Sequence, residues 1–186
     1  KTPEKARLDI THFANLTPDE LRMIERRANE VVLANIPVKK SIMQKNLAEK
    51  KYGFRLYQGG AVPGASIRVI ETEGFDVEAC GGTHLNNTGE VGFIKITGSR
   101  KIQDGVLRLE YVAGSRALDE MQKDSKLLTD ASAIFSIPSE QLPKTCLRFF
   151  EEWKNQRKDI EKLKQASQPQ KPVQQQMKPQ QIKKKK

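Results

Sequence analysis

The chain has 186 residues, which is enough for one folded domain with an appendage. Its formal net charge is +10, but the last twenty residues hold six lysines and no acid, which leaves 27 basic against 23 acidic side chains elsewhere, or +4. A basic balance favours a polyanionic partner through counterion release, and it serves solubility equally well. No run of 18 apolar residues is present, which excludes a helix that spans a membrane.

The cysteines and the first residues of the chain indicate its compartment. Cys80 and Cys146 lie far apart in the sequence and do not form the framework of a disulfide-stabilised secreted domain. The first residues contain no apolar stretch of the kind that signal peptides carry. We therefore expect a cytoplasmic protein that has no membrane partner.

The first predicted element is a half-buried strand at residues 7–13, where apolar and polar side chains alternate. A helix is predicted next. Thr17 is its N-cap, Pro18 suits the first helical position, and Glu20 completes a capping box. Apolar side chains recur at helical spacing as far as Asn35, where the helix is expected to end.

The middle of the chain is predicted to alternate strands, a short helix and loops. The strands are expected at residues 38–43, 66–71 and 75–78, and the helix at residues 44–51. Residues 57–64 hold three glycines and a proline and form a loop. The backbone of this loop is either able to approach a ligand closely or serves as a plain connecting turn.

The rest of the chain is predicted to contain a β-hairpin and two helices. The hairpin strands lie at residues 91–99 and 106–112 and are joined through an Asp-Gly turn. Helices at residues 114–135 and 139–165 are separated by a short break, which suggests an antiparallel pair. The fold class is therefore α+β, a mixed or antiparallel sheet with packed helices, followed by a helical hairpin and a disordered tail rich in Gln, Pro and Lys.

The chemistry of the chain is concentrated at residues 80–84, which read Cys-Gly-Gly-Thr-His. Cys80 and His84 stand four positions apart across a flexible turn, and a thiolate and an imidazole are both zinc ligands. The pair is half of a tetrahedral site, so a buried cysteine beside a turn is the alternative reading. A cysteine nucleophile is a third reading, which would need a base within reach of Cys80.

Three segments, in this order, resemble the editing domain of alanyl-tRNA synthetase, and most of all its archaeal branch. They are residues 7–12 (Arg-Leu-Asp-Ile-Thr-His), residues 57–64 (Tyr-Gln-Gly-Gly-Ala-Val-Pro-Gly) and residues 80–84. Free-standing alanyl-tRNA editing proteins and the editing domain of threonyl-tRNA synthetase are more distant relatives. The resemblance is specific because all three segments occur together.

The resemblance also implies an organisation into parts. Residues 1–113 resemble the editing, or second additional, domain and are incomplete at their N-terminus. Residues 114–166 resemble the helical segment that links this domain to a C-terminal dimerisation domain, so the parent protein is expected to be a homodimer through a region absent here. Residues 167–186 resemble nothing in the family and are the expected disordered tail.

In this family the editing domain hydrolyses the ester between alanine tRNA and a wrong amino acid, serine or glycine. Members carry zinc, held by a His-x-x-x-His pair and a Cys-x-x-x-His pair, and the second pair corresponds to Cys80 and His84. The first pair belongs upstream of residue 7, and this chain does not contain it. We therefore expect the 186 residues to be a piece of a longer protein that holds half of the zinc site.

Other residues are candidates for binding the mischarged end of the tRNA. Thr83 and Gln58 are candidate catalytic residues that hydrogen-bond a serine hydroxyl or the ribose, or else stabilise their own turns. The candidate substrate-binding residues are Gly59, Gly60, Gly81, Gly82 and Arg68, the glycines because their N–H groups can face substrate oxygens. Basic side chains are candidate phosphate contacts or solvated surface, namely Arg68, Arg100, Lys101 and Arg108.

The resemblance leaves two functions open. One is a zinc-dependent hydrolase domain that acts on mischarged alanine tRNA. The other is a non-catalytic fragment that binds tRNA or helps subunits to associate through the long helices. A deacylation assay with serine-charged alanine tRNA separates them.

Overall fold

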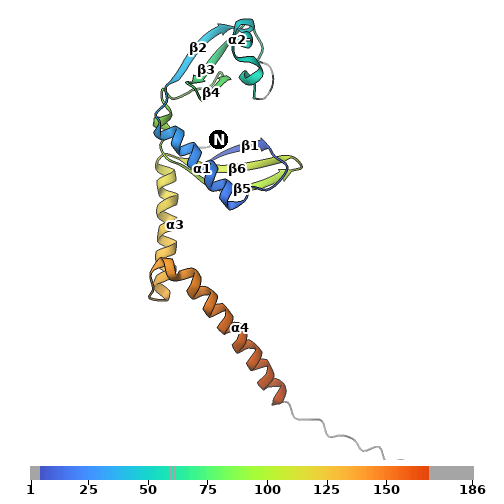
Figure 1. Ribbon diagram of the computed structural model, residues 1–186, viewed down its shortest axis with the longest axis vertical. Coiled ribbons are helices and arrows are strands. Elements are labelled where there is room, and N and C mark those ends of the chain that lie inside the picture. Colours follow the sequence, from blue (N-terminus) through green and yellow to red (C-terminus); the bar gives the residue numbers. More distant parts are fainter. Residues whose placement is uncertain (1–4, 59, 61, 168–186) are drawn as a thin grey trace, which may run out of the picture. The chain divides into compact units, whose positions relative to one another are not determined.

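The computed structural model describes residues 5–58, 60 and 62–167, so that all of the predicted disordered tail at residues 167–186 except Ser167 lies outside them. Two compact units are present, with the boundary between Leu127 and Leu128, inside helix α3 (Ser115–Ile134). The first unit holds two separate three-stranded sheets and helices α1 (Pro18–Leu33) and α2 (Lys45–Tyr52) (Figure 1). The α+β class with antiparallel sheets is confirmed, whereas the division at residues 113 and 166 stays a prediction.

The first sheet has the strand order β1-β6-β5 and is antiparallel throughout. Its strands are β1 (Ala6–Thr11), β5 (Ile94–Gln103) and β6 (Val106–Ala113). β5 and β6 form the predicted hairpin, and Gly105 adopts the positive φ of +73° that the turn requires. The central strand β6 supplies the buried side chains Leu107, Leu109 and Val112. The N-terminal strand thus pairs with a strand about a hundred residues away, which local sequence patterns do not reveal.

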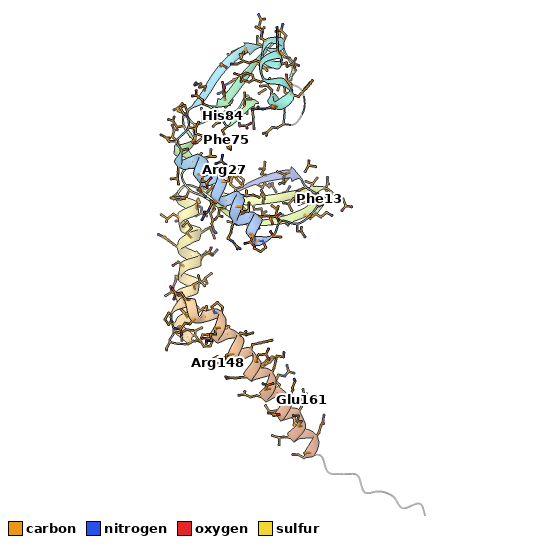
Figure 2. All side chains as sticks on the ribbon, in the orientation of Figure 1. Phe13, Arg27, Phe75, His84, Arg148 and Glu161 are labelled. Atoms are coloured by element: carbon orange, nitrogen blue, oxygen red, sulfur yellow. The ribbon has the colours of Figure 1, made fainter. Side chains whose placement is uncertain are left out.

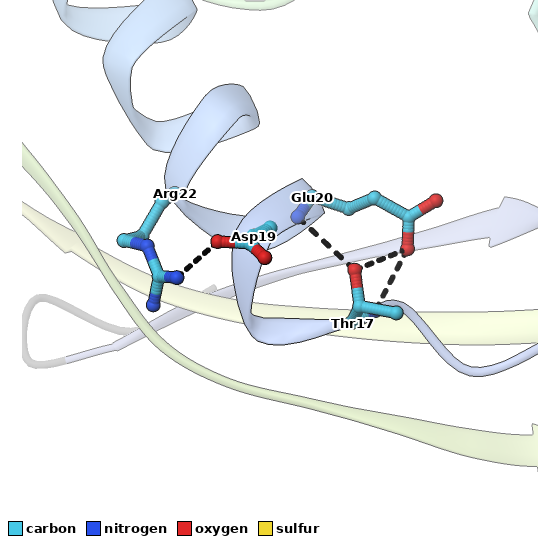
Figure 3. Close-up of polar contacts among 4 residues, drawn as sticks. All are labelled: Thr17, Asp19, Glu20 and Arg22. Carbon is cyan, nitrogen blue, oxygen red and sulfur yellow. Dashed lines mark hydrogen bonds and ion pairs between the residues drawn. The ribbon is translucent and has the colours of Figure 1, made fainter.

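Helix α1 (Pro18–Leu33) begins at the predicted capping box (Figure 3). The backbone N–H of Glu20 donates to Thr17 Oγ1 over 3.2 Å, and Glu20 Oε2 accepts from the backbone N–H of Thr17 over 2.7 Å. The Thr17 hydroxyl also donates to the same carboxylate oxygen over 2.9 Å. The bond from the Thr17 backbone, followed by that from its side chain, holds the pKa of Glu20 below its usual value.

Replacing Thr17 with alanine is expected to lower the free energy of unfolding by about 1 kcal/mol, because the first turn of α1 loses its side-chain acceptor. Chemical denaturation monitored by circular dichroism measures this difference. Thr17→Ser is the matched control, since it keeps the hydroxyl and should remain close to the original protein. Equal stability of the alanine and serine variants would show that the capping box does not stabilise the helix.

Side chains of α1 form hydrogen bonds with backbone groups at the outer edge of β5. The amide of Asn29 donates to the carbonyl of Ile94 and accepts from its N–H, both over 2.8 Å. Glu25 accepts from the N–H of Ile96 over 2.7 Å. These contacts replace the hydrogen bonds of a further strand, so the helix protects an edge that would otherwise be open to another chain.

The second sheet has the strand order β2-β3-β4 and is also antiparallel. Its strands are β2 (Val38–Gln44), β3 (Ser66–Thr72) and β4 (Asp76–Ala79). Helix α2 (Lys45–Tyr52) and the short helix η1 (Gly53–Leu56) follow β2, and Gly53 ends α2 with a φ of +69°. One hydrophobic core joins these elements, and it consists of Ala48, Leu56, Ile67, Val69 and Val77.

Two neighbouring connections tie the second sheet to the rest of the first unit. Residues 36–38 lead from α1 into β2, and residues 86–88 lead away from β4 into the short helix η2 (Thr88–Val91). The N–H of Val38 donates to Asn86 O over 2.8 Å, and that of Thr88 donates to Ile36 O over 3.0 Å. The two connections therefore run side by side as a short antiparallel bridge.

A second close approach of two backbones occurs just before β5, where Gly92 lies against Gly114. Its φ is +70°, and a Cβ atom at this position would lie 2.9 Å from the Cα atom of Gly114. Any larger residue would therefore combine a strained backbone with a steric clash. The N–H of Gly114 donates to Phe93 O over 2.8 Å in the same region.

Gly92→Ala is expected to lower the free energy of unfolding by about 2–4 kcal/mol, the sum of overpacking and a left-handed backbone. The matched control is Gly98→Ala, also in the β5 region, where an added Cβ would meet nothing within 4 Å. Thermal or urea unfolding of both variants gives the comparison. The expectation is wrong if Gly92→Ala unfolds at the same denaturant concentration as Gly98→Ala.

The second unit continues from α3 (Ser115–Ile134) through the short helix η3 (Ser139–Gln141) to α4 (Leu142–Ala166). The predicted break is confirmed, since Ser136 has a φ of +52° and Pro138 follows it. The rings of Phe135 and Phe149 lie 5.2 Å apart across the break. The antiparallel pairing of the two helices stays a prediction. No helix within the described residues is long and apolar enough to cross a membrane.

Candidate functional site

The two faces of the β2-β3-β4 sheet differ, because successive side chains of a strand point to opposite faces. Ile67, Val69 and Val77 face the hydrophobic core that includes Ala48 of α2. The intervening positions of β3 and β4 face the other way, and we call this the site face. It carries the side chains of Arg68, Ile70, Thr72, Asp76 and Glu78.

Cys80 is the first residue after β4 and continues the alternation of that strand. Val69 pairs with Ala79 in the sheet, so Cys80 stands opposite Arg68. Its backbone N–H donates to Arg68 O over 3.1 Å. Side chains of directly opposed residues lie on the same face, which puts the half-buried thiol of Cys80 on the site face.

His84 stands at the other end of the Gly-Gly turn (Figure 2). A Cβ atom built on Gly82 would lie 3.6 Å from Cys80 Sγ and 3.9 Å from His84 Nε2. Both atoms therefore lie within 4 Å of one point, and Nε2 is shielded from solvent. The structure thus brings the predicted metal ligands to the same side of the turn.

The two glycines of the turn have different surroundings. Beyond the adjacent residues, a Cβ atom at Gly81 would meet nothing within 4 Å, whereas one at Gly82 would contact both candidate ligand atoms. A Cβ atom at Gly82 would therefore approach the imidazole of His84, and one at Gly81 would not. The two glycines cannot be told apart from the sequence, because what an added Cβ atom would contact at each depends on the path of the turn.

The donor set of the turn fits zinc as two ligands of a tetrahedral site. Zinc lies roughly 2.3 Å from a thiolate sulfur and roughly 2.0 Å from an imidazole nitrogen, and the two candidate atoms lie on the same side of the turn. Across residues 5–58, 60 and 62–167, no group of three His, Cys, Asp or Glu side chains is placed to hold a metal ion. That Cys80 and His84 are zinc ligands stays a prediction.

A cavity of about 360 Å³ lies next to His84. Thr83 and His84 line it from the turn, and Asp76 and Glu78 line it from β4. It thus offers a hydroxyl, an imidazole and two carboxylates to a small polar ligand. The sequence prediction named Thr83 and His84 but missed Asp76 and Glu78. Their spacing could have revealed them, since residues 76, 78 and 80 fall on one face of a strand.

Gln58, in the loop at residues 57–64, contacts a side chain of the site face. Gln58 Nε2 donates to Glu78 Oε1 on β4. The Tyr57 hydroxyl donates to Glu49 Oε1 over 2.7 Å, and this bond raises the pKa of Tyr57. Gly60 has a φ of +119°, in the region that favours glycine. Gly59, the other predicted substrate-binding glycine of this loop, lies outside the described residues.

The predicted phosphate contacts fall in two different places. Arg68 contacts the turn, with NH1 3.3 Å from Cys80 O. The other three belong to the first sheet, where they form the ion pairs Arg108–Asp9 over 2.6 Å, Arg100–Glu110 over 3.8 Å and Lys101–Asp104 over 2.7 Å. The bond from Arg108 holds the pKa of Asp9 below its usual value. A role for these three residues in binding phosphate stays a prediction.

Comparisons with known proteins identify what the chain is similar to. Residues 67–110 match the family described as the threonyl and alanyl tRNA synthetase second additional domain, and this segment includes the whole Cys80–His84 turn. The alanine–tRNA ligase of Methanococcus aeolicus is 55% identical over 159 residues, which are 86% of this chain and 18% of that protein. The alanine–tRNA ligase of Methanopyrus kandleri is 52% identical over 163 residues, 88% of this chain and 18% of the relative.

A third relative gives the same picture. The alanine–tRNA ligase of Methanothermobacter thermautotrophicus is 50% identical over 165 residues, which are 89% of this chain and 18% of that protein. The chain therefore spans a little under a fifth of the length of the curated relatives that it matches.

Proposed function

Since this chain is related to archaeal alanine–tRNA ligases over most of its length and carries the second additional domain, we propose that it is the editing part of such an enzyme. The proposed reaction is hydrolysis of the ester that joins serine or glycine to alanine tRNA. The observation that carries the proposal is that Cys80 Sγ and His84 Nε2 lie within 4 Å of one point. A thiol and an imidazole in this arrangement suit a zinc-dependent hydrolase.

Alanine selection gives a physical reason for a separate hydrolytic site. A pocket that admits alanine cannot exclude glycine by size, and it rejects serine poorly. One small group changes the binding free energy by only about 1–3 kcal/mol, which is too little for accurate protein synthesis. A second site that destroys the wrong esters removes this limit. The cavity beside His84 has a partly apolar lining that also carries hydroxyl, imidazole and carboxylate groups, and these can bind the hydroxyl of a serine side chain.

We assign the following roles to the residues of the site face. Cys80 and His84 would hold zinc, which when bound polarises an ester carbonyl or lowers the pKa of a water molecule. The N–H groups of Gly81 and Gly82 are available to bind substrate oxygens. Thr83 lines the cavity and can donate its hydroxyl to the ligand. Gln58 acts indirectly, because its amide is bonded to Glu78.

Deacylation of mischarged tRNA tests the proposal. The assays use the 186-residue chain and a chimeric ligase, defined as the Methanococcus aeolicus alanine–tRNA ligase with this chain in place of its matching segment. We expect the chimeric ligase to release serine and glycine from alanine tRNA at least about tenfold faster than alanine. A chelator should abolish this release, and added zinc should restore it.

The isolated chain is expected to bind zinc weakly, because two protein ligands are fewer than the three that catalytic zinc sites use. Normal charging of tRNA with alanine shows that the chimeric ligase is folded. If this charging is normal while seryl-tRNA decays at its uncatalysed rate, the proposed editing activity is wrong.

A second candidate function is a non-catalytic fragment that binds tRNA or joins subunits. Large apolar side chains exposed on α4 favour it, namely Leu147, Phe149, Phe150, Trp153, Ile160 and Leu163. Sedimentation of the chain over a range of concentrations distinguishes self-association from monomeric behaviour. A chain that binds tRNA or associates, without supporting hydrolysis in the chimeric ligase, would favour this second function.

A further inference from the structure

Arg68 lies on β3 within hydrogen-bonding distance of the Cys80–Gly82 turn. β3 is the central strand of its sheet, so the backbone of Arg68 is held from both sides. Its directly opposed neighbours are Ile42 on β2 and, by continuation of the register, Cys80. The backbone of Arg68 is therefore paired with a strand on each side, and its side chain lies on the same face as the Cys80 thiol.

Arg68 contacts the turn at three points. Its carbonyl oxygen accepts the N–H of Cys80 over 3.1 Å, which extends the pairing of β3 with β4 by one residue. Its guanidinium NH1 donates to the carbonyl oxygen of Cys80 over 3.3 Å and to that of Gly82. One side chain thus binds carbonyls on both sides of Gly81, in the segment where the strand has ended.

The turn needs such a support because its own residues supply little rigidity. Gly81 and Gly82 have more backbone freedom than residues of any other type, and beyond the adjacent residues nothing lies within 4 Å of the place of a Gly81 Cβ. Without external contacts, the direction in which the chain leaves Cys80 would vary, and the position of His84 relative to the thiol would vary with it. A guanidinium is suited to hold two carbonyl groups at once because its donors lie in a fixed plane.

We propose that Arg68 is a positioning residue that fixes the Cys80–Gly82 turn, so that Cys80 and His84 face one metal ion. The inference rests on the proposed function, and it assigns Arg68 to the turn in place of the phosphate contact that the sequence predicts. Partners that orient metal ligands typically change metal affinity by about 10- to 100-fold when they are removed. The mobility of the turn can be measured without any metal, which separates this proposal from the proposed hydrolysis.

The test uses Arg68→Met, which keeps most of the side-chain length and removes both donations, and Arg68→Lys, which keeps a donor and the charge. Arg55→Met, at an exposed arginine of η1, is the matched control. All variants are made in a Cys146→Ser background, so that Cys80 is the one thiol that can react. The readouts are amide hydrogen exchange at residues 80–84, the rate of Cys80 alkylation, and the thiolate-to-cobalt absorption band during titration with Co²⁺.

Arg68→Met is expected to accelerate exchange and alkylation and to weaken apparent Co²⁺ affinity by about 10-fold or more, with Arg68→Lys between it and the original protein. Arg55→Met should change none of these readouts. Unchanged exchange in Arg68→Met, with an unaltered circular dichroism spectrum, would overturn the proposal whatever the metal does. If the chimeric ligase shows no Co²⁺ band that depends on Cys80, the zinc site of the proposed function is wrong, and the exchange data still decide the role of Arg68.

Discussion

Replacing Cys80 with alanine in the chimeric ligase is expected to lower the hydrolysis of seryl-tRNA by at least about 100-fold. The loss should be at least as large as the 10- to 100-fold cost of removing a partner that only orients a metal ligand. Cys80 Sγ is one of the two atoms that lie within 4 Å of the position of a Gly82 Cβ, so its removal leaves His84 alone on this side of the site. Single-turnover deacylation at saturating enzyme measures the change directly.

Cys146→Ala is the matched control, because Cys146 is the other cysteine of the chain and lies exposed on α4. It should leave hydrolysis unchanged. His84→Ala should cost as much as Cys80→Ala, and the double variant should be little worse than either, since residues that act as one unit have non-additive effects. Additive losses would argue against a shared metal ion.

A further substitution separates a metal ligand from a nucleophile. Cys80→His retains an atom that can bind zinc, whereas it removes any sulfur that could form a covalent intermediate. We expect partial hydrolysis that depends on added zinc. Trapping of an aminoacyl group on Cys80 after rapid quenching would instead support the nucleophile, and the zinc-ligand assignment would then be wrong.

The second large effect is expected at Gly82. A methyl group at this position would lie 3.6 Å from Cys80 Sγ and 3.9 Å from His84 Nε2, which are ordinary contact distances. Gly82→Ala should therefore fold normally, with a change of less than about 1 kcal/mol in the free energy of unfolding. The methyl group fills space next to both ligand atoms, so hydrolysis of seryl-tRNA should fall by about 10- to 100-fold.

Gly81→Ala provides a close control, because the added methyl group would meet nothing within 4 Å outside the two adjacent residues, and so no atom of His84. It should keep both stability and hydrolysis near the original values. The comparison of the two neighbours therefore tests the side of the turn on which the reaction occurs. Equal rates for both alanine variants, with both proteins folded, would place the reacting ester away from the space between Cys80 and His84.

Elements that depend on neighbouring residues could be predicted from the sequence. The capping box at Thr17 and Glu20 and the Asp-Gly hairpin are set within a few positions, and the structure confirms both. The grouping of six strands into two sheets could not be predicted in this way. It depends on contacts such as that of β1 with β6, whose partners are remote in the sequence and whose pairing is not encoded by either strand alone.

In the candidate site too, features set by neighbouring residues could be predicted, whereas features set by long-range contacts could not. Cys80 and His84 could be chosen from the sequence because few residue types bind zinc and the pair is close together. Glu78 shares a strand face with Cys80 and could have been inferred from that spacing, whereas its contact with Gln58, twenty positions earlier, depends on the fold. Arg68 was noticed for its charge and expected at phosphate, whereas its contacts with Cys80 and Gly82 depend on the three-dimensional path of the turn.

The bridge between Pro37 and Asn87 has a consequence for how this molecule can vary. The polypeptide leaves α1 and returns to η2 at adjacent positions, so the segment from β2 to β4 begins and ends at one short antiparallel bridge. Such a segment behaves as a cassette, because its size and sequence can change while the spacing of its two ends stays constant. The candidate site residues of this segment can therefore diverge, or be exchanged, while the first sheet keeps its strand register and its contacts with α1.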